Sequence, residues 1–165
     1  MYKRQGKDFS LSNCGMHAMD IMRMESGFLH WGHDISPEEN QYEAGLNFAI
    51  SYKKNIDFIG KQALLKIKEK KQTKKFVMLT LKNSTPGEPL MLHDEPIYVD
   101  SKIIGRTTSG NYSFNFNKNL AFGFLKIDEG INSLKNKLIE IEIEKNKYEA
   151  EVLDKPLNQK DYKNY

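Results

Sequence analysis

The residues of this chain with the clearest chemical potential lie between Met22 and Asp34. Arg23 falls near the end of a predicted helix, and its planar guanidinium could donate paired hydrogen bonds to a carboxylate or to the carbonyl group of a heterocycle. Asp20 stands one helical turn earlier, so the simpler interpretation is an ion pair on the helix surface, worth about 0.2–0.5 kcal/mol. Spacing alone favours the ion pair.

A histidine-containing loop follows Arg23 and suggests a metal site. His30, His33 and Asp34 are suitable ligand types, but the His-x-x-His spacing is short for common zinc modules and no fourth ligand follows nearby, so we predict no metal site. Trp31 either packs against the next turn or stacks on a ligand, and packing is the simpler role. Ser109 could act as a nucleophile only beside a histidine base that no motif supplies, so we predict a structural role for it.

The first part of the chain has the patterns of short helices and loops. Apolar residues recur at helical spacing from Gly15 to Glu25, and Gly27 is suited to end that helix. Ser36-Pro37-Glu38-Glu39 has the sequence of a helix start, with a cap, an early proline and a glutamate. We expect a strand from Leu46 to Tyr52 and a further helix from Gly60 to Glu69.

From Phe76 onward the hydrophobic period changes to two, which is typical of strands with one buried face. The strongest alternation predicts that Ile139, Ile141 and Ile143 point inward and that the glutamates between them face solvent. Short strands separated by turn residues predict a small antiparallel barrel. The expected strands are Phe76–Leu81, Pro96–Val99, Lys102–Thr107, Leu120–Leu125, Leu138–Glu144 and Tyr148–Leu153.

Composition limits the classes of protein to consider. Of 165 residues, 39% are hydrophobic and 28% charged, which is enough apolar content for a core, and no apolar run approaches the ~20 residues that span a bilayer. The single cysteine, Cys14, and the absence of a secretory signal suit a reducing cytoplasm. The net charge is +3, and six lysines fall between Lys66 and Lys75. Without interleaved arginines or aromatics, this lysine run predicts solvated surface rather than a nucleic-acid site.

Two stretches of the chain resemble the folate-binding aminomethyltransferase (glycine-cleavage T-protein) family. Residues 22–46 contain Met22-Arg23-Met24-Glu25-Ser26-Gly27, similar to the family motif Leu-Arg-Leu-Glu-x-Gly. Residues 105–124 contain Thr108-Ser109-Gly110-Asn111-Tyr112, similar to Thr-Ser-Gly-x-Tyr. Within the family, the chain is most similar to the C-terminal half of dimethylglycine and sarcosine dehydrogenases.

The resemblance implies an α+β protein with two parts. Residues 6–72 would be the C-terminal portion of the folate-binding α/β domain of an aminomethyltransferase, and residues 73–165 the small antiparallel β-barrel that follows it in the family. Residues 1–5 resemble a sequencing-adapter scar, and we expect the chain to be the downstream part of a longer protein. The Gly-x-Gly-x-x-Gly fingerprint does not occur in the sequence, so FAD would belong to an upstream domain of the parent protein.

The same resemblance implies a role in one-carbon metabolism. Tetrahydrofolate would accept a one-carbon unit from a dimethylglycine-, sarcosine- or glycine-type amine donor, with Arg23, Trp31 and Tyr162 as folate contacts. The key aspartate and the pterin-binding glutamate of the family lie upstream, which would leave Arg23 without a carboxylate partner. We therefore predict no catalytic residue here, and a chain that is inactive and binds folate weakly by itself. The alternatives are a folate-dependent methyltransferase of the sulfonium-demethylase type, or a non-catalytic folate-binding or docking module of a flavin oxidoreductase.

Overall fold

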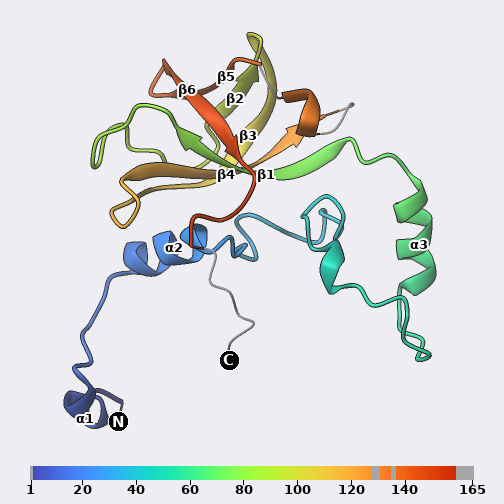
Figure 1. The fold of residues 1–165 in the computed structure, drawn as a ribbon, viewed down its shortest axis with the longest axis horizontal. Helices are drawn as coiled ribbons and strands as arrows, with labels where there is room; N and C mark the ends of the chain where they lie inside the picture. Colours follow the sequence, from blue (N-terminus) through green and yellow to red (C-terminus); the bar gives the residue numbers. More distant parts are fainter. Residues whose placement is uncertain (1, 128–130, 135–136, 159–165) are drawn as a thin grey trace.

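The computed structural model describes residues 2–127, 131–134 and 137–158. Within these residues, Figure 1 shows a β-barrel with helices outside it, joined by long loops, so the protein is α+β as the sequence predicts. The helices are α1 (Tyr2–Gln5), α2 (Met16–Glu25) and α3 (Lys61–Glu69), with short 3-10 turns at Lys7–Phe9, Asn47–Ala49 and Ile131–Leu134. The strands are β1 (Lys74–Leu81), β2 (Pro96–Val99), β3 (Lys102–Ser113), β4 (Lys118–Lys126), β5 (Ile139–Ile143) and β6 (Asn146–Leu153).

The six strands close into an antiparallel barrel. Their order is β1-β4-β3-β2-β5-β6, and β6 pairs back onto β1, so the sheet has no open edge. Each predicted strand after residue 72 is present, although β3 continues well past the predicted end at Thr107. The prediction of a small antiparallel barrel is confirmed.

The predicted register of β5 is also confirmed. Ile139, Ile141 and Ile143 are 4%, 0% and 2% exposed and belong to the cluster of side chains that fills the barrel. The tight turn to β6 consists of Glu144 and Lys145, with φ of 49° and 66°. Two successive positive φ angles match the right-handed twist of a hairpin with a two-residue turn, so this turn sets the register in which the three isoleucines point inward.

Strand β4 is buried on both faces and links the barrel to α2. Ala121 and Leu125 belong to the barrel core, whereas Leu120 and Phe122 pack against Met24 of α2. Alternate side chains of a strand point to opposite faces, which explains why β4 is apolar at nearly every position. The second face of β4 therefore fixes α2 on the outside of the barrel.

Gly27 ends α2 as predicted. Its φ is 74°, and the backbone N–H groups of Gly27 and Phe28 donate to the carbonyls of Met24 (3.0 Å) and Arg23 (2.8 Å). This pair of bonds is the Schellman motif, which favours glycine because the backbone is left-handed. A Cβ atom at this position would also lie 2.6 Å from Cγ of Pro156. The left-handed turn and the close approach of Pro156 both require a glycine.

Two predicted elements do not form. Ser36 and Glu39 make the side-chain contact of a helix cap, with the Ser36 N–H and hydroxyl both donating to the carboxylate (2.9 and 2.7 Å), but only turns follow. The segment Leu46–Tyr52 contains a 3-10 turn in place of the predicted strand. A strand needs a neighbouring strand to complete its hydrogen bonds, and none of the described strands pairs with this segment.

Helix α3 forms where it was predicted but lies apart from the barrel in Figure 1. None of its side chains is fully buried, and five of the six lysines in the run from Lys66 to Lys75 are exposed, as expected for solvated surface. In the described part of the chain, no helix is long and apolar enough to cross a membrane.

The remaining lysine of the run, Lys74, joins the loop before α3 to β1. Its Nζ lies 2.5 Å from Oε1 of Glu39. Partial burial alone would raise the pKa of Glu39, but hydrogen bonds from Lys74 and Ser36 outweigh it and lower the pKa below its ordinary value of 4.5. A carboxyl group whose pKa is lowered by folding stabilises the folded state at pH values above its ordinary pKa. This stabilisation is lost as the pH falls through the pKa of the folded state.

We expect Glu39→Gln to reduce the free energy of unfolding by about 0.5 kcal/mol at neutral pH, since the ion pair is partly exposed. At an acidic pH well below 4.5, the difference between the two proteins should shrink as the native carboxylate becomes protonated. Urea unfolding at both pH values measures the effect. An equal loss at both would show that the charge of Glu39 is not the cause.

Candidate functional site

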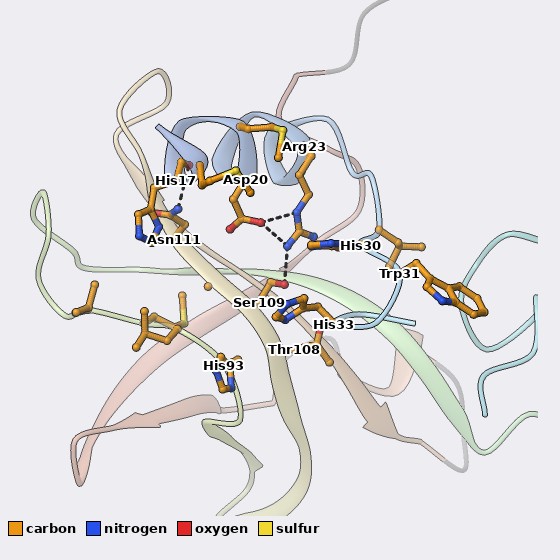
Figure 2. A pocket seen from close by; sticks show the side chains of 17 residues that line it. His17, Asp20, Arg23, His30, Trp31, His33, His93, Thr108, Ser109 and Asn111 are labelled. Atoms are coloured by element: carbon orange, nitrogen blue, oxygen red, sulfur yellow. Dashed lines mark hydrogen bonds and ion pairs between the residues drawn. The ribbon is translucent and has the colours of Figure 1, made fainter. Parts of the chain in front are cut away.

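A cavity of about 510 Å³ opens between α2, the loop of residues 28–34, the segment before β2 and strand β3 (Figure 2). The surface of its wall is mostly apolar, and polar side chains are placed among the apolar ones, which is typical of sites for small organic ligands. Methionine and leucine side chains supply much of this wall: Met16, Met19, Leu29, Leu90, Met91 and Leu92.

Arg23 reaches the cavity wall from α2, and its side chain is only 15% exposed. Its Nε and Nη2 atoms contact the carboxylate of Asp20 at 2.9 and 2.8 Å. Nη1 donates to the carboxylate of Asp34 and to the backbone carbonyl of Phe28 (3.3 Å). Nη2 also donates to Oγ of Ser109 (2.6 Å). A guanidinium has five N–H donors, and four hydrogen bonds of Arg23 go to groups within the protein. The expected pair with Asp20 is therefore one part of a larger network that joins α2 to β3.

Asp34 is the central acceptor of this network, and its side chain is 0% exposed. Besides Arg23, it accepts hydrogen bonds from the backbone N–H of His30 (2.8 Å) and from the hydroxyls of Thr108 (2.5 Å) and Ser109 (2.8 Å). Several donors and a facing arginine compensate the burial of the carboxylate. The expectation that Arg23 would lack a carboxylate partner is wrong, because this chain supplies the partner itself.

A bulge in β3 allows two consecutive side chains to reach Asp34. Neighbouring residues of a strand normally point to opposite faces. The pairing of β3 with β4 skips Thr108, however, and the residues on either side of it pair with consecutive residues of β4. The extra residue brings the hydroxyl of Thr108 to the same carboxylate as that of Ser109.

Gly110 allows a close approach between β3 and the segment before β2. A Cβ atom here would lie 2.5 Å from Cγ of Met91 and 2.9 Å from its backbone. The segment that carries Met91 therefore lies directly against β3, and it forms one wall of the cavity.

A second buried carboxylate, Glu25, fixes the end of α2. It is 2% exposed and accepts hydrogen bonds from the hydroxyl of Ser113 (2.6 Å) and from Nδ2 of Asn115 (3.0 Å). The backbone carbonyl of Glu25 accepts a bond from the N–H of Asn158 (2.8 Å). These contacts tie the helix that carries Arg23 to the hairpin between β3 and β4.

The structure places two of the three predicted folate contacts. Arg23 lines the cavity, whereas Trp31 borders it, is 65% exposed and points away from its centre in Figure 2, so little of the ring packs on the following turn. Tyr162 lies outside the described residues. The rings of His30 and His33 lie 4.8 Å apart, and the described residues include no group of three or more His, Cys, Asp or Glu side chains that could hold a metal ion.

Sequence reasoning missed the structural roles of Asp34 and Glu25. Charged residues are usually exposed, and the hydroxyls that bind these two carboxylates, on Ser109 and Ser113, lie 75 and 88 residues further along the chain. The positions of these two residues in the sequence could have indicated their roles. Glu25 belongs to the same motif as Arg23, and Asp34 lies at the end of the loop within residues 22–46, which resemble the family.

A closed antiparallel barrel with an arginine–carboxylate network on its flank, beside a cavity of ligand size, defines a barrel domain with a candidate small-molecule site. Comparison with family models identifies the family. Residues 74–158 match the glycine cleavage T-protein C-terminal barrel domain, and residues 3–54 match the GCVT N-terminal domain. The chain belongs to the glycine cleavage T-protein family. The boundary that we predicted between residues 72 and 73 remains a prediction.

Relatives include both dehydrogenases and transferases. Human mitochondrial dimethylglycine dehydrogenase is 34% identical over 152 residues, which cover 92% of this chain and 17% of that protein. An aminomethyltransferase of Listeria innocua is 39% identical over 142 residues, which cover 86% of this chain and 37% of that protein. The crystal structure of the glycine cleavage system aminomethyltransferase T from Bartonella henselae superimposes with a TM-score of 0.79 at 22% identity, covering 94% of this chain and 42% of that one. This chain thus spans less than half the length of each.

Proposed function

We propose that this chain is the barrel-containing portion of a tetrahydrofolate-dependent aminomethyltransferase. In the whole protein, folate would accept a one-carbon unit from a dimethylglycine-, sarcosine- or glycine-type amine. Membership of the T-protein family and the likeness to dimethylglycine dehydrogenase support this function. The observation that carries the proposal is the position of Arg23, from the family motif, in the wall of an apolar cavity.

The residues around the cavity fit a flat, partly apolar ligand such as tetrahydrofolate. The volume of about 510 Å³ suits a small organic molecule, and methionine side chains adapt well to aromatic rings. Arg23 would contact folate by giving up one of its contacts within the protein. The contact with Asp20 is the easier to replace, because the side chain of Asp20 is 32% exposed and that of Asp34 is fully buried. Bound tetrahydrofolate would supply the nitrogen atoms that accept the one-carbon unit.

In this proposal the described residues bind and orient folate, and the aspartate that acts on the one-carbon donor comes from an upstream segment. An upstream FAD domain would oxidise the amine, as in the dehydrogenases that the chain resembles. We keep the cytoplasm as the proposed location, since the single cysteine, Cys14, is free and exposed.

Arg23→Ala in the complete parent protein should weaken tetrahydrofolate binding by about ten- to a hundredfold, because a charge-assisted hydrogen bond to a ligand contributes about 1.5–3 kcal/mol. Arg23→Lys should lose nearly as much, since an ammonium group cannot reproduce the planar fork. Calorimetry measures the affinity, flavin-dependent amine oxidation should be largely unchanged, and circular dichroism with thermal unfolding checks that the part of the protein that carries Arg23 is still folded.

Arg106→Ala is the matched control. Arg106 is 72% exposed and pairs with Asp94 on the surface, so its loss should leave folate affinity unchanged. If both Arg23 variants also bind folate normally, Arg23 has only the structural role of connecting α2 to β3. That result would favour the non-catalytic docking module, an alternative that is consistent with the four hydrogen bonds that Arg23 makes within the protein.

A further inference from the structure

The hydroxyl of Ser109 connects Arg23 to the buried carboxylate that pairs with it. Ser109 is 5% exposed, lines the cavity from β3 and accepts a hydrogen bond from Nη2 of Arg23 at 2.6 Å, a contact that Figure 2 shows. The hydroxyl donates its own proton to Oδ1 of Asp34 at 2.8 Å. A guanidinium only donates and an ionised carboxylate only accepts, so the hydroxyl has one possible orientation between these two groups.

The guanidinium of Arg23 is surrounded by separate parts of the chain. Asp20 contacts it from α2, Asp34 from the following loop and Ser109 from β3. On β4, the ring of Phe122 is 1% exposed and its centre lies 5.3 Å from Cζ of the arginine. Asp20 is one turn earlier on the same helix and 32% exposed, so it can move together with Arg23. Ser109 belongs to a strand of the closed barrel, which fixes its position.

We propose that Ser109 is a positioning residue, which holds the guanidinium of Arg23 in one orientation relative to the barrel before a ligand enters the cavity. The guanidinium is planar, so a contact that fixes Nη2 also fixes the edge that is turned toward the cavity. A ligand then meets a group that is already oriented, and less conformational freedom is lost on binding. This inference deepens the proposed function and rests on it for the choice of tetrahydrofolate as the ligand.

Thr108 provides the matched comparison. Its hydroxyl donates to the same oxygen, Oδ1 of Asp34, at 2.5 Å, but in the described part of the chain it makes no hydrogen bond to Arg23. If Ser109 acts only by satisfying Asp34, then Thr108→Val and Ser109→Ala should have the same effect. A positioning role predicts a difference, because only Ser109 touches the guanidinium.

NMR of nitrogen-labelled arginine side chains in the 165-residue chain tests the orientation directly. The chain has three arginines, Arg4, Arg23 and Arg106, and the first and last of these are exposed. A guanidinium that is bonded at both Nη atoms rotates slowly about its C–N bonds, so Arg23 should give separate Nη proton signals. The two exposed arginines should give averaged signals and serve as internal references. Loss of the Arg23 signals in Arg23→Lys assigns them.

Three variants locate the effect. Ser109→Ala should increase the rotation rate of the Arg23 guanidinium by at least about tenfold, because a hydrogen bond to a charged group is lost. Thr108→Val should leave the Arg23 signals separate, and Ser109→Thr, which keeps the hydroxyl, should restore slow rotation. Circular dichroism with thermal unfolding checks that each variant is folded. If the added methyl group prevents Ser109→Thr from folding, the comparison of the other two variants still decides the result.

Tetrahydrofolate affinity of the complete parent protein measures the consequence. Ser109→Ala should weaken binding by about three- to tenfold, and Thr108→Val should weaken it less. The proposal is overturned if the Arg23 signals stay separate in Ser109→Ala, if both variants have equal effects, or if Ser109→Ala binds folate normally while Arg23→Ala does not. Failure of the proposed function is distinguishable, since Arg23→Ala itself would then bind folate normally, and the NMR comparison would still decide whether Ser109 orients the guanidinium.

Discussion

Asp34→Ala is expected to lower the free energy of unfolding by about 3–5 kcal/mol, because it removes the buried carboxylate that pairs with Arg23 and leaves only the partly exposed Asp20 as a partner of the arginine. The side chain of Asp34 is 0% exposed, and the hydroxyls of Thr108 and Ser109 would lose their acceptor as well. Asp34→Asn keeps the shape and one acceptor, so it should cost less. Urea unfolding followed by circular dichroism measures both losses.

An exposed pair provides the control for Asp34. Asp57 lies 3.6 Å from Lys61 and its side chain is 79% exposed, so Asp57→Ala should cost no more than about 0.5 kcal/mol. If Asp34→Ala costs no more than this control, the network does not hold the loop of residues 28–34 on the barrel.

Ile141→Ala should cost about 2–5 kcal/mol, since it removes a fully buried side chain from the centre of the barrel. The neighbouring variant Glu140→Ala acts on the outward face of the same strand, where Glu140 only pairs loosely with Lys147 at 3.4 Å, and should cost no more than about 1 kcal/mol. Comparing the two by thermal and urea unfolding tests the register of β5 in solution. Similar losses for both variants would contradict the inward orientation of Ile141.

The barrel could be predicted because its information is local. Alternation at Ile139, Ile141 and Ile143 identifies both the strand and its buried face, and Gly27 marks a helix end through its own backbone freedom. The segment Leu46–Tyr52 has a similar composition but forms no strand, because a strand also depends on a partner that local sequence does not reveal.

The network around Arg23 could be predicted only in part. The motif identified Arg23, but the choice between a surface pair with Asp20 and a buried network depends on β3, which lies far along the chain. Local spacing carries no information about that approach. The burial of Asp34 follows from the same long-range contact, so a carboxylate that the sequence suggested as a metal ligand is instead an internal acceptor for an arginine and two hydroxyls.

The bulge at Thr108 makes the length of β3 as important as its composition. In a regular strand only every second residue could face Asp34, and the two hydroxyls that now meet it would lie on opposite sides of the sheet. Gain or loss of one residue between Thr107 and Ser109 would therefore change which side chains meet the carboxylate, even if every residue type in the motif were kept. For this part of the molecule, tolerance to substitution and tolerance to insertion or deletion are separate properties, and the second should be the more restricted.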